Sequence, residues 1–248
     1  MPGQKGRLRS TFDDVVSLSG VPSGDRILEV GCGTEQATLP LARRGYGILC
    51  VELGENLAAV ARRNLAAYPR VEILTADFED ATLPERAFDL LVSATAFQWL
   101  DPAVACPKAA RSLKSGGATA LFWNEHAATD ADGGFLCRSA EGLRARGAGD
   151  LRRGEHGGPP RPEELPDRTG EIEGSGLFEP VVRRTYLWEQ AYDVEGYLRV
   201  LDTYSGHIAF GEEGKARLYG GISQLIRDRY GGRIVKGYAT SPYVARKR

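Results

Sequence analysis

The stretch Ile27-Leu-Glu-Val-Gly-Cys-Gly-Thr34 determines the fold that we expect of this chain. Its apolar residues predict a buried strand from Ile27 to Val30, then a turn with glycines at positions 31 and 33, and a helix that begins near Glu35. Glycine is favoured where the backbone takes a positive φ or a ligand approaches closely. A strand that leads through such a turn to a helix N-terminus forms a crevice of nucleotide size.

The residues around this turn indicate which nucleotide the crevice takes. Glu52 lies 21 residues after Gly31, where the next parallel strand is expected to end, and a carboxylate there can accept both hydroxyls of a ribose. A dinucleotide site needs a third small residue so that the helix packs close, but Gln36 stands at that position. Glu29 would repel a pyrophosphate and could indirectly hold an ammonium group. The pattern favours a ligand with a ribose, no phosphate and an amino-acid end, which describes S-adenosylmethionine.

Strand and helix patterns alternate along the first half of the chain. Apolar runs that predict strands lie at 27–31, 48–52, 71–75, 88–94 and 118–123, with helical patterns at 36–44, 55–67 and 102–113. This alternation predicts βαβ units and a parallel sheet that is covered on both faces. The turns 22–24 and 115–117 lead into the first and fifth strands.

The two ends of the chain are less regular. We expect residues 1–10 to be mobile or folded over the cofactor cleft, and 12–18 to form a short helix. Residues 127–170 are rich in Gly, Pro, Arg and Glu, which is typical of a functional lid or of disorder. Beyond them the patterns predict strands at 181–188 and 234–245 and helices at 135–146, 193–204 and 211–230.

The chain resembles the class I S-adenosylmethionine-dependent methyltransferases, and most closely the small-molecule enzymes that include ubiquinone/menaquinone and trans-aconitate methyltransferases. The likeness covers residues 25–125 well and continues less specifically to the end. It rests on signals in the order and spacing of that family, namely Glu29-Val-Gly-Cys-Gly-Thr34, Glu52, Ala76-Asp77-Phe78, Phe88 to Ala94, Phe97-Gln-Trp99 and Leu113-Lys-Ser-Gly-Gly117.

The resemblance implies an α/β fold, a Rossmann-like doubly wound sheet of seven strands. The sheet is expected to be mostly parallel with an antiparallel last strand, and to carry helical lid insertions. Residues 1–248 would form a single methyltransferase domain with its cofactor-binding core at 20–125. The segments 126–180 and 190–231 would then be lid elements on the acceptor side.

The resemblance also implies the cofactor contacts. Glu52 would bind the ribose, Asp77 would accept from the adenine amino group, and Phe78 would cover the ring. Glu29 would anchor the glycine turn, or the methionine amino group through water. The whole expected set is Glu29, Gly31, Cys32, Gly33, Thr34, Glu52, Leu53, Asp77, Phe78, Ala94 and Phe97. The alternatives are a surface carboxylate for Glu52 and an ordinary turn residue for Asp77.

One position departs from the family pattern. Glu35 stands where the family has a third glycine, beside the methionine end of the cofactor. Its side chain could turn outward and cap the helix N-terminus, where negative charge is favourable. It could instead crowd the cofactor.

Methyl transfer from a sulfonium mainly needs a positioned acceptor and an absence of water. Residues 97–99 follow the fourth strand and should face the methyl group and the acceptor, with Gln98 as a polar contact and Trp99 either there or in the core. His126 could be a general base, since imidazole titrates near neutral pH. Tyr204 and His207 could contact the acceptor from the roof of the pocket. The candidate catalytic residues are therefore His207, His126, Gln98 and Tyr204.

Composition excludes several classes of function. The 32 basic and 33 acidic residues give a net charge of −1, which does not suggest a general nucleic-acid binder. No apolar run approaches a membrane span, and residues 1–6 lack the apolar core of a signal peptide. The four cysteines and three histidines have no metal-ligand spacing, so we expect no metal, and buried thiols in a reducing cytoplasm.

We therefore expect a cytoplasmic enzyme that transfers a methyl group from S-adenosylmethionine to O, N or C of a small molecule. RNA or protein methylation is an alternative. It is supported by a cluster of arginines at Arg138, Arg144, Arg146, Arg152 and Arg153. A protein that binds the cofactor without methyl transfer is another alternative, motivated by Glu35. The sequence does not indicate the acceptor or the oligomeric state.

Overall fold

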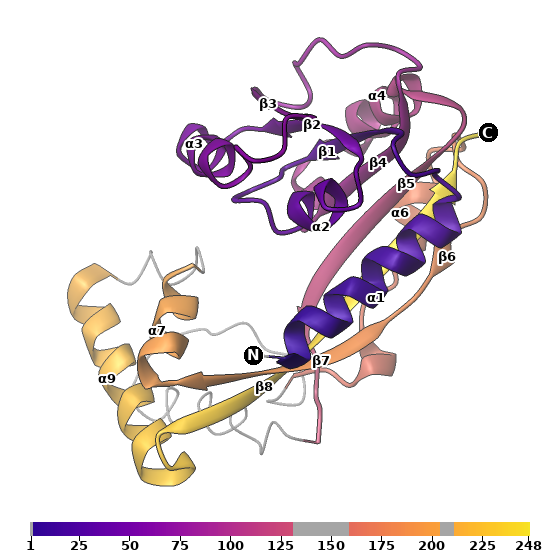
Figure 1. Cartoon of the computed structure of the whole chain (residues 1–248). Coiled ribbons are helices and arrows are strands. Elements are labelled where there is room, and N and C mark those ends of the chain that lie inside the picture. Colours follow the sequence, from indigo (N-terminus) through magenta and orange to yellow (C-terminus); the bar gives the residue numbers. More distant parts are fainter. Residues whose placement is uncertain (1, 131–158, 204–210) are drawn as a thin grey trace. The chain divides into compact units, whose positions relative to one another are not determined.

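The computed structural model describes residues 2–130, 159–203 and 211–248 (Figure 1). The chain divides into two compact units. The first comprises Met1–Asn124, Pro166–Tyr186 and Thr240–Arg248, and the second comprises Glu125–Leu165 and Leu187–Ala239. Tyr204, His207, the arginine cluster and the helix expected at 135–146 lie outside the described residues.

A mixed sheet of eight strands forms the framework. Its order is β3-β2-β1-β4-β5-β8-β6, and β7 also pairs with β8. The pairs β1–β2, β1–β4, β2–β3 and β4–β5 are parallel, while β6 and β8 are antiparallel. The strands are β1 Arg26–Val30, β2 Gly47–Glu52, β3 Val71–Thr75, β4 Phe88–Ala94, β5 Leu113–His126, β6 Val182–Arg183, β7 Tyr186–Asp193 and β8 Arg233–Arg246. The prediction of a Rossmann-like, mostly parallel α/β sheet with an antiparallel C-terminal part is confirmed.

The strand count differs from the predicted seven because the segment expected as one strand at 181–188 forms two. β6 ends at Arg183 and β7 begins at Tyr186. The Arg184 amide still donates to the carbonyl of Pro242 at 3.1 Å, but Pro242 has no N–H to return. The ladder against β8 is therefore interrupted at this place, and the next strand starts beyond it.

The fifth strand also begins earlier than predicted. The turn expected at 115–117 lies within β5, where the register against β4 shifts between the pairs Phe88–Leu113 and Leu90–Ala118. Gly116 has φ +75, a conformation that glycine adopts without strain. The predicted turn is thus an irregularity inside a longer strand.

Helices follow the predicted order with altered ends. The first helix, α1 Pro2–Ser19, is longer than the predicted 12–18 and includes most of residues 1–10, which were expected to be mobile or folded over the cofactor cleft. The helix after the glycine turn is short, because residues 31–37 belong to the turn. The others are α2 Thr38–Ala42, α3 Glu55–Asn64, α4 Pro102–Ser112, α6 Thr169–Glu173, α7 Val194–Asp202 and α9 Gly211–Tyr230, with 3-10 turns η1 Phe97–Trp99 and η2 Pro162–Glu164.

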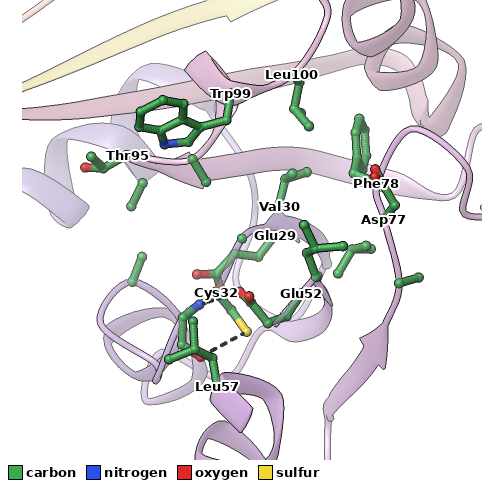
Figure 2. A pocket seen from close by; sticks show the side chains of 18 of the residues that line it. Glu29, Val30, Cys32, Glu52, Leu57, Asp77, Phe78, Thr95, Trp99 and Leu100 are labelled. Atoms are coloured by element: carbon green, nitrogen blue, oxygen red, sulfur yellow. Dashed lines mark hydrogen bonds between the residues drawn. The ribbon is translucent and has the colours of Figure 1, made fainter. Parts of the chain in front are cut away.

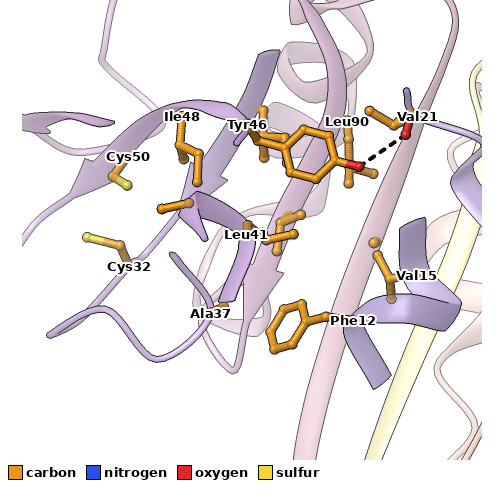
Figure 3. Close-up of a cluster of buried hydrophobic side chains, with 14 of the residues drawn as sticks. Phe12, Val15, Val21, Cys32, Ala37, Leu41, Tyr46, Ile48, Cys50 and Leu90 are labelled. Carbon is orange, nitrogen blue, oxygen red and sulfur yellow. Dashed lines mark hydrogen bonds between the residues drawn. The ribbon is translucent and has the colours of Figure 1, made fainter. Parts of the chain in front are cut away.

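Both faces of the central parallel strands β1 and β4 are buried. Ile27 of β1 packs into one cluster with α1 and α2, while Leu28 and Val30 pack into another with α4. Figure 3 shows the first cluster, in which the Tyr46 hydroxyl donates to the Val21 carbonyl at 3.1 Å. Alternate residues of a strand point to opposite faces, so a strand that is apolar throughout belongs between two helical layers.

The second unit has its own small core. Tyr197 and Leu201 of α7 pack with Leu218, Ile222 and Ile226 of α9 and with Ile234 of β8. Asp193 caps α7 by accepting a hydrogen bond from the Gly196 amide at 2.7 Å. These contacts account for the two late helices that the sequence predicts.

Candidate functional site

A cavity of about 590 Å³ lies at the carboxyl ends of the parallel strands in the first unit. This is the edge at which open α/β sheets bind ligands. Figure 2 shows its side chains converging from β1, β2 and the segments that follow β3 and β4. The lining residues are Glu29, Val30, Gly31, Cys32, Gly33, Gln36, Ala37, Val51, Glu52, Leu53, Leu57, Ala76, Asp77, Phe78, Glu79, Ala94, Thr95, Ala96, Trp99, Leu100 and Asn124.

The glycine turn after β1 forms the floor of the cavity. Gly31 has φ +72, and a Cβ there would overlap the Cβ of Ala96. Gly33 has φ +58, and its amide points at the carboxylate of Glu52. Both glycines are therefore required by backbone conformation, and Gly31 also by the close approach of the segment after β4.

The carboxylate of Glu52 is fixed by two backbone amides. The Gly33 amide donates to Oε2 at 2.8 Å and the Gly54 amide donates to Oε1 at 2.9 Å. Glu52 is only 6 % exposed at the end of β2. Each oxygen accepts one of these bonds and keeps further lone-pair capacity. A pre-positioned acceptor pair therefore lines the cavity.

Glu29 contributes a second carboxyl group with a different environment. It is 1 % exposed, and burial raises its pKa to about 7, against the lowering effect of hydrogen bonds from Thr38 and Cys50. The Cys50 thiol donates to Oε2 at 3.8 Å, while Oε1 is buried and has no hydrogen-bond partner within the described structure. A cation bound nearby would favour the charged form.

Asp77 and Phe78 follow β3 at the next strand end. The Glu79 amide donates to Oδ1 of Asp77 at 2.8 Å, which orients the carboxylate within its turn. The Phe78 ring is buried and has the Phe97 ring behind it, with centroids 6.4 Å apart. Lys108 lies over the Phe78 ring at 5.5 Å and donates to the Glu79 carbonyl.

Most of the predicted cofactor residues meet at this one cavity. Glu29, Gly31, Cys32, Gly33, Glu52, Leu53, Asp77, Phe78 and Ala94 all line it. Thr34 and Phe97 are not among the lining residues. The Thr34 hydroxyl accepts a hydrogen bond from Gln36 Nε2, and Phe97 packs behind Phe78. The roles assigned to these residues stay predictions.

The segment after β4 turns Trp99, rather than Gln98, toward the cavity. Trp99 is 81 % exposed, so it does not belong to the core. Gln98 donates to the Thr95 carbonyl at 3.3 Å and is not a lining residue. Asn124 of β5 lines the cavity and accepts from the Thr240 hydroxyl at 2.5 Å.

His126 belongs to the second unit, where its ring lies 5.1 Å from that of Tyr238. Burial, with a smaller contribution from Lys236, lowers its pKa to about 4. The imidazole is therefore neutral at neutral pH and a weak base. The other proposed catalytic groups, Tyr204 and His207, lie outside the described residues, as does His156.

Several lining residues were not predicted. Leu57 lies in the first turn of α3, three residues beyond the Gly54 whose amide donates to Glu52, and Asn124 ends the first unit's part of β5. The others are Val30, Gln36, Ala37, Val51, Ala76, Glu79, Thr95, Ala96 and Leu100. Most directly neighbour a predicted residue, so extending each motif by one position would have found them.

Residues 28–121 match a family model described as a methyltransferase domain. The chain contains a class I S-adenosylmethionine-dependent methyltransferase domain. The matched segment runs from β1 into β5 and includes the glycine turn, Glu52 and Asp77. Within the described residues, no helix is long and apolar enough to cross a membrane, and no cluster of His, Cys, Asp or Glu is arranged to hold a metal ion.

Curated relatives share this same segment. An uncharacterized methyltransferase of Mycobacterium tuberculosis is 35 % identical over 99 residues, which cover 40 % of each chain. Malonyl-[acyl-carrier protein] O-methyltransferase of Geobacter sulfurreducens is 43 % identical over 77 residues, 30 % of this chain and 29 % of the relative. Demethylmenaquinone methyltransferase of Clavibacter sepedonicus is 31 % identical over 96 residues, 38 % and 39 %. The chain spans less than half the length of these relatives.

Solved structures share the fold over nearly the whole chain. A protein of Anaeromyxobacter dehalogenans has a TM-score of 0.64 and 22 % identity, covering 97 % of this chain and 95 % of its own. The YcgJ protein of Bacillus subtilis has a TM-score of 0.57 and 14 % identity, with 96 % and 98 % covered. A phosphoethanolamine N-methyltransferase of Haemonchus contortus, in complex with S-adenosyl-L-methionine, has a TM-score of 0.51 and 17 % identity, with 96 % and 52 % covered.

Proposed function

We propose that this protein transfers the methyl group of S-adenosylmethionine to a small-molecule acceptor, and that the cavity of the first unit holds the cofactor. The observation that carries the proposal is the Glu52 carboxylate, which two glycine amides fix at the end of β2 beside the glycine turn. A carboxylate so placed accepts the two hydroxyls of a ribose. The cavity has a volume typical of sites for small organic ligands.

The residues present fit this cofactor at each of its parts. Glu52 would take the ribose, and Asp77 with Phe78 would take the adenine. The buried carboxyl of Glu29, whose Oε1 has no hydrogen-bond partner within the described structure, fits the positively charged methionine end. When bound, the cofactor supplies a methyl group on a sulfonium, which is an excellent leaving group. The protein's own residues then have to orient the acceptor and keep water away.

The segments 126–180 and 190–231 are the acceptor-side elements in this proposal. Aromatic side chains gather in the second unit, to which Tyr192 of the later segment belongs: Trp188 stacks on Tyr238 with ring centroids 4.4 Å apart, and the hydroxyls of Tyr192 and Tyr238 are 3.1 Å apart. Both segments lie outside residues 28–121, the part that matches the family model. A part of the fold that lies outside the shared segment suits the role of setting acceptor specificity.

Isothermal titration with S-adenosylmethionine and S-adenosylhomocysteine tests the cofactor. We expect saturable binding of both to the wild-type protein, and Glu52→Gln to weaken it by about tenfold to a hundredfold, because hydrogen bonds to a charged acceptor are each worth about 1.5–3 kcal/mol. The matched control is Glu72→Gln, which removes the same charge from an exposed position on β3. Absence of binding to the wild-type protein, or equal effects of the two variants, would contradict the proposal.

Methylation of RNA is the second candidate, because a ribosomal RNA small subunit methyltransferase of Alkaliphilus oremlandii is 35 % identical over 69 residues, 28 % of this chain and 24 % of its own. Labelled methyl incorporation distinguishes the two candidates. Transfer to bulk RNA without transfer to small metabolites would replace the small-molecule proposal.

A further inference from the structure

Large apolar side chains that line the cavity are exposed to solvent. Trp99 is 81 % exposed, Leu53 71 % and Leu57 44 %, and all three line it. They are three of the seven exposed large hydrophobic residues in the part of the chain that the structure describes. Single exposed apolar residues are ordinary, but a group of them beside a concave site marks a surface that binds a ligand.

Trp99 is held in place by its backbone and not by its ring. The Trp99 amide donates to the Ala96 carbonyl at 3.1 Å and closes the turn η1. Thr95, two residues before η1 begins, has φ +58, a strained value for a threonine. Strained residues of this kind cluster at ligand sites. Figure 2 shows the indole on the opposite side of the cavity from Cys32 and Glu52. The indole therefore lines the cavity across from the residues that the proposed function assigns to the ribose and the glycine turn.

The cavity wall is acidic. Glu29, Glu52, Asp77 and Glu79 line it, and the described lining residues include no basic side chain. In the proposed function Glu29 faces the methionine end of the cofactor, whereas Glu52 and Asp77 accept from neutral groups of the cofactor, which add no positive charge to the wall. Carboxylates with low-dielectric walls attract and stabilise cations, and they repel anions.

We propose that the acceptor is a small organic amine and that the face of the Trp99 indole holds it at the nitrogen. This inference rests on the proposed function. Trp offers the strongest cation–π surface of the aromatic residues. The acidic wall and the exposed indole therefore both favour a group that bears positive charge on nitrogen.

The chemistry of transfer to nitrogen suits this wall. The lone pair of a neutral amine forms the new N–C bond while the C–S bond breaks, and sulfur keeps the electron pair of that bond. The positive charge passes from sulfur to nitrogen, and the one proton released to water is the proton that an ammonium acceptor loses before its lone pair can attack. Because the charge persists through the transition state, carboxylates and the indole stabilise it throughout. A carboxylate acceptor would instead be repelled on entry.

Binding of three isosteric probes to the complex with S-adenosylhomocysteine tests the proposal. The probes are choline, uncharged 3,3-dimethylbutan-1-ol and anionic 3,3-dimethylbutyrate, each measured by isothermal titration. We expect saturable choline binding about tenfold tighter than that of the alcohol, and no saturation by the anion. Equal binding of choline and the alcohol, tighter binding of the anion, or no saturable choline binding would each overturn the proposal.

Two variants assign the effect to Trp99. Trp99→Leu keeps an apolar side chain without a ring and should weaken choline binding by about tenfold, while Trp99→Phe should keep most of it. Choline affinity is compared at saturating S-adenosylhomocysteine, so that a change in cofactor affinity does not enter the comparison. An unchanged choline affinity in Trp99→Leu would overturn the role of Trp99. Failure of the wild type to bind S-adenosylhomocysteine would instead refute the proposed function itself.

Discussion

Two carboxyl groups of the same cavity are held in opposite ways. Glu52 receives an amide hydrogen bond on each oxygen, so its environment offers donors to the charged form. Glu29 is buried almost completely and accepts a hydrogen bond from the Cys50 thiol, and burial raises its pKa to about 7. Glu52 is therefore a fixed acceptor, whereas the charge of Glu29 depends on pH and on what is bound beside it.

We expect Glu29 to make the stability of the protein without ligand depend on pH. Its pKa rises from 4.5 to about 7 on folding, because burial disfavours the charged form. Between these values the folded chain binds a proton that the unfolded chain has released, so the free energy of unfolding falls as pH rises from about 4.5 to about 7. The loss is on the order of 3 kcal/mol, at 1.36 kcal/mol for each pKa unit.

Urea unfolding at about pH 5 and about pH 7.5 measures this dependence. Glu29→Gln should flatten it, because the amide does not titrate, while the exposed Glu72→Gln should leave it as in the wild type. A Glu29→Gln variant with the wild-type pH dependence would show that other groups are responsible.

The third position of the glycine turn stores strain. Glu35 has φ +115, a conformation that side chains rarely adopt, and its Oε2 is buried without a hydrogen-bond partner in the described structure. Glu35→Gly should raise the free energy of unfolding by about 1 kcal/mol relative to Glu35→Ala, since both remove the carboxylate and only glycine relieves the backbone. Thermal unfolding of the two variants makes the comparison. Equal midpoints would mean that the backbone at position 35 is not strained.

At the scale of elements, the start of α4 connects two sides of the cavity. Asp101 caps the helix by accepting from the Ala103 amide at 2.9 Å, and its own amide donates to Oε1 of Glu79 at 2.6 Å. Pro102 occupies the first turn, where its missing N–H is harmless. The segment after β3 is thereby tied to the helix that follows β4.

We expect Asp101→Ala to cost about 1 kcal/mol of stability, because the N-cap hydrogen bond is lost and the amide bond to Glu79 is not. Asp101→Asn keeps an acceptor oxygen and should cost only a few tenths of this. Chemical denaturation of both variants gives the difference. A similar loss in both would point to the charge of Asp101 rather than to capping.

Elements that bury apolar runs could be predicted from the sequence, and side-chain directions in turns could not. The strand 88–94 was predicted at its observed ends, because buried parallel strands are apolar runs between turn residues, and the edge strand 71–75 was also predicted at its observed ends although it is only partly covered. The start of α2 was placed too early, because the positive φ of Glu35 leaves no mark on hydrophobic spacing. In η1 the sequence could not show that Trp99 faces the cavity while Phe97 packs behind Phe78, since a 3-10 turn places neighbours on different sides.

For the whole molecule, the division into two compact units places the described cavity in one unit and the core of the two late helices in the other. All described lining residues of the cavity lie in the first unit, and the core of α7 and α9 lies in the second. A ligand stabilises the part of a protein that binds it, by about 2.7 kcal/mol at a hundred times its dissociation constant. Cofactor binding should therefore stabilise the first unit against local opening more than the second.

Amide hydrogen exchange with and without S-adenosylhomocysteine can measure this difference between the two units. We expect slower exchange at 27–37, 51–57, 76–80 and 94–100, because these segments supply the cavity, and unchanged exchange in the interior of α9. At a ligand concentration about ten times the wild-type dissociation constant, Glu52→Gln should reduce the difference, while Glu72→Gln should retain it in full. Protection that is greatest in α7 and α9 would show that the cofactor binds in the second unit, and the cavity at the strand ends would then have to serve another ligand.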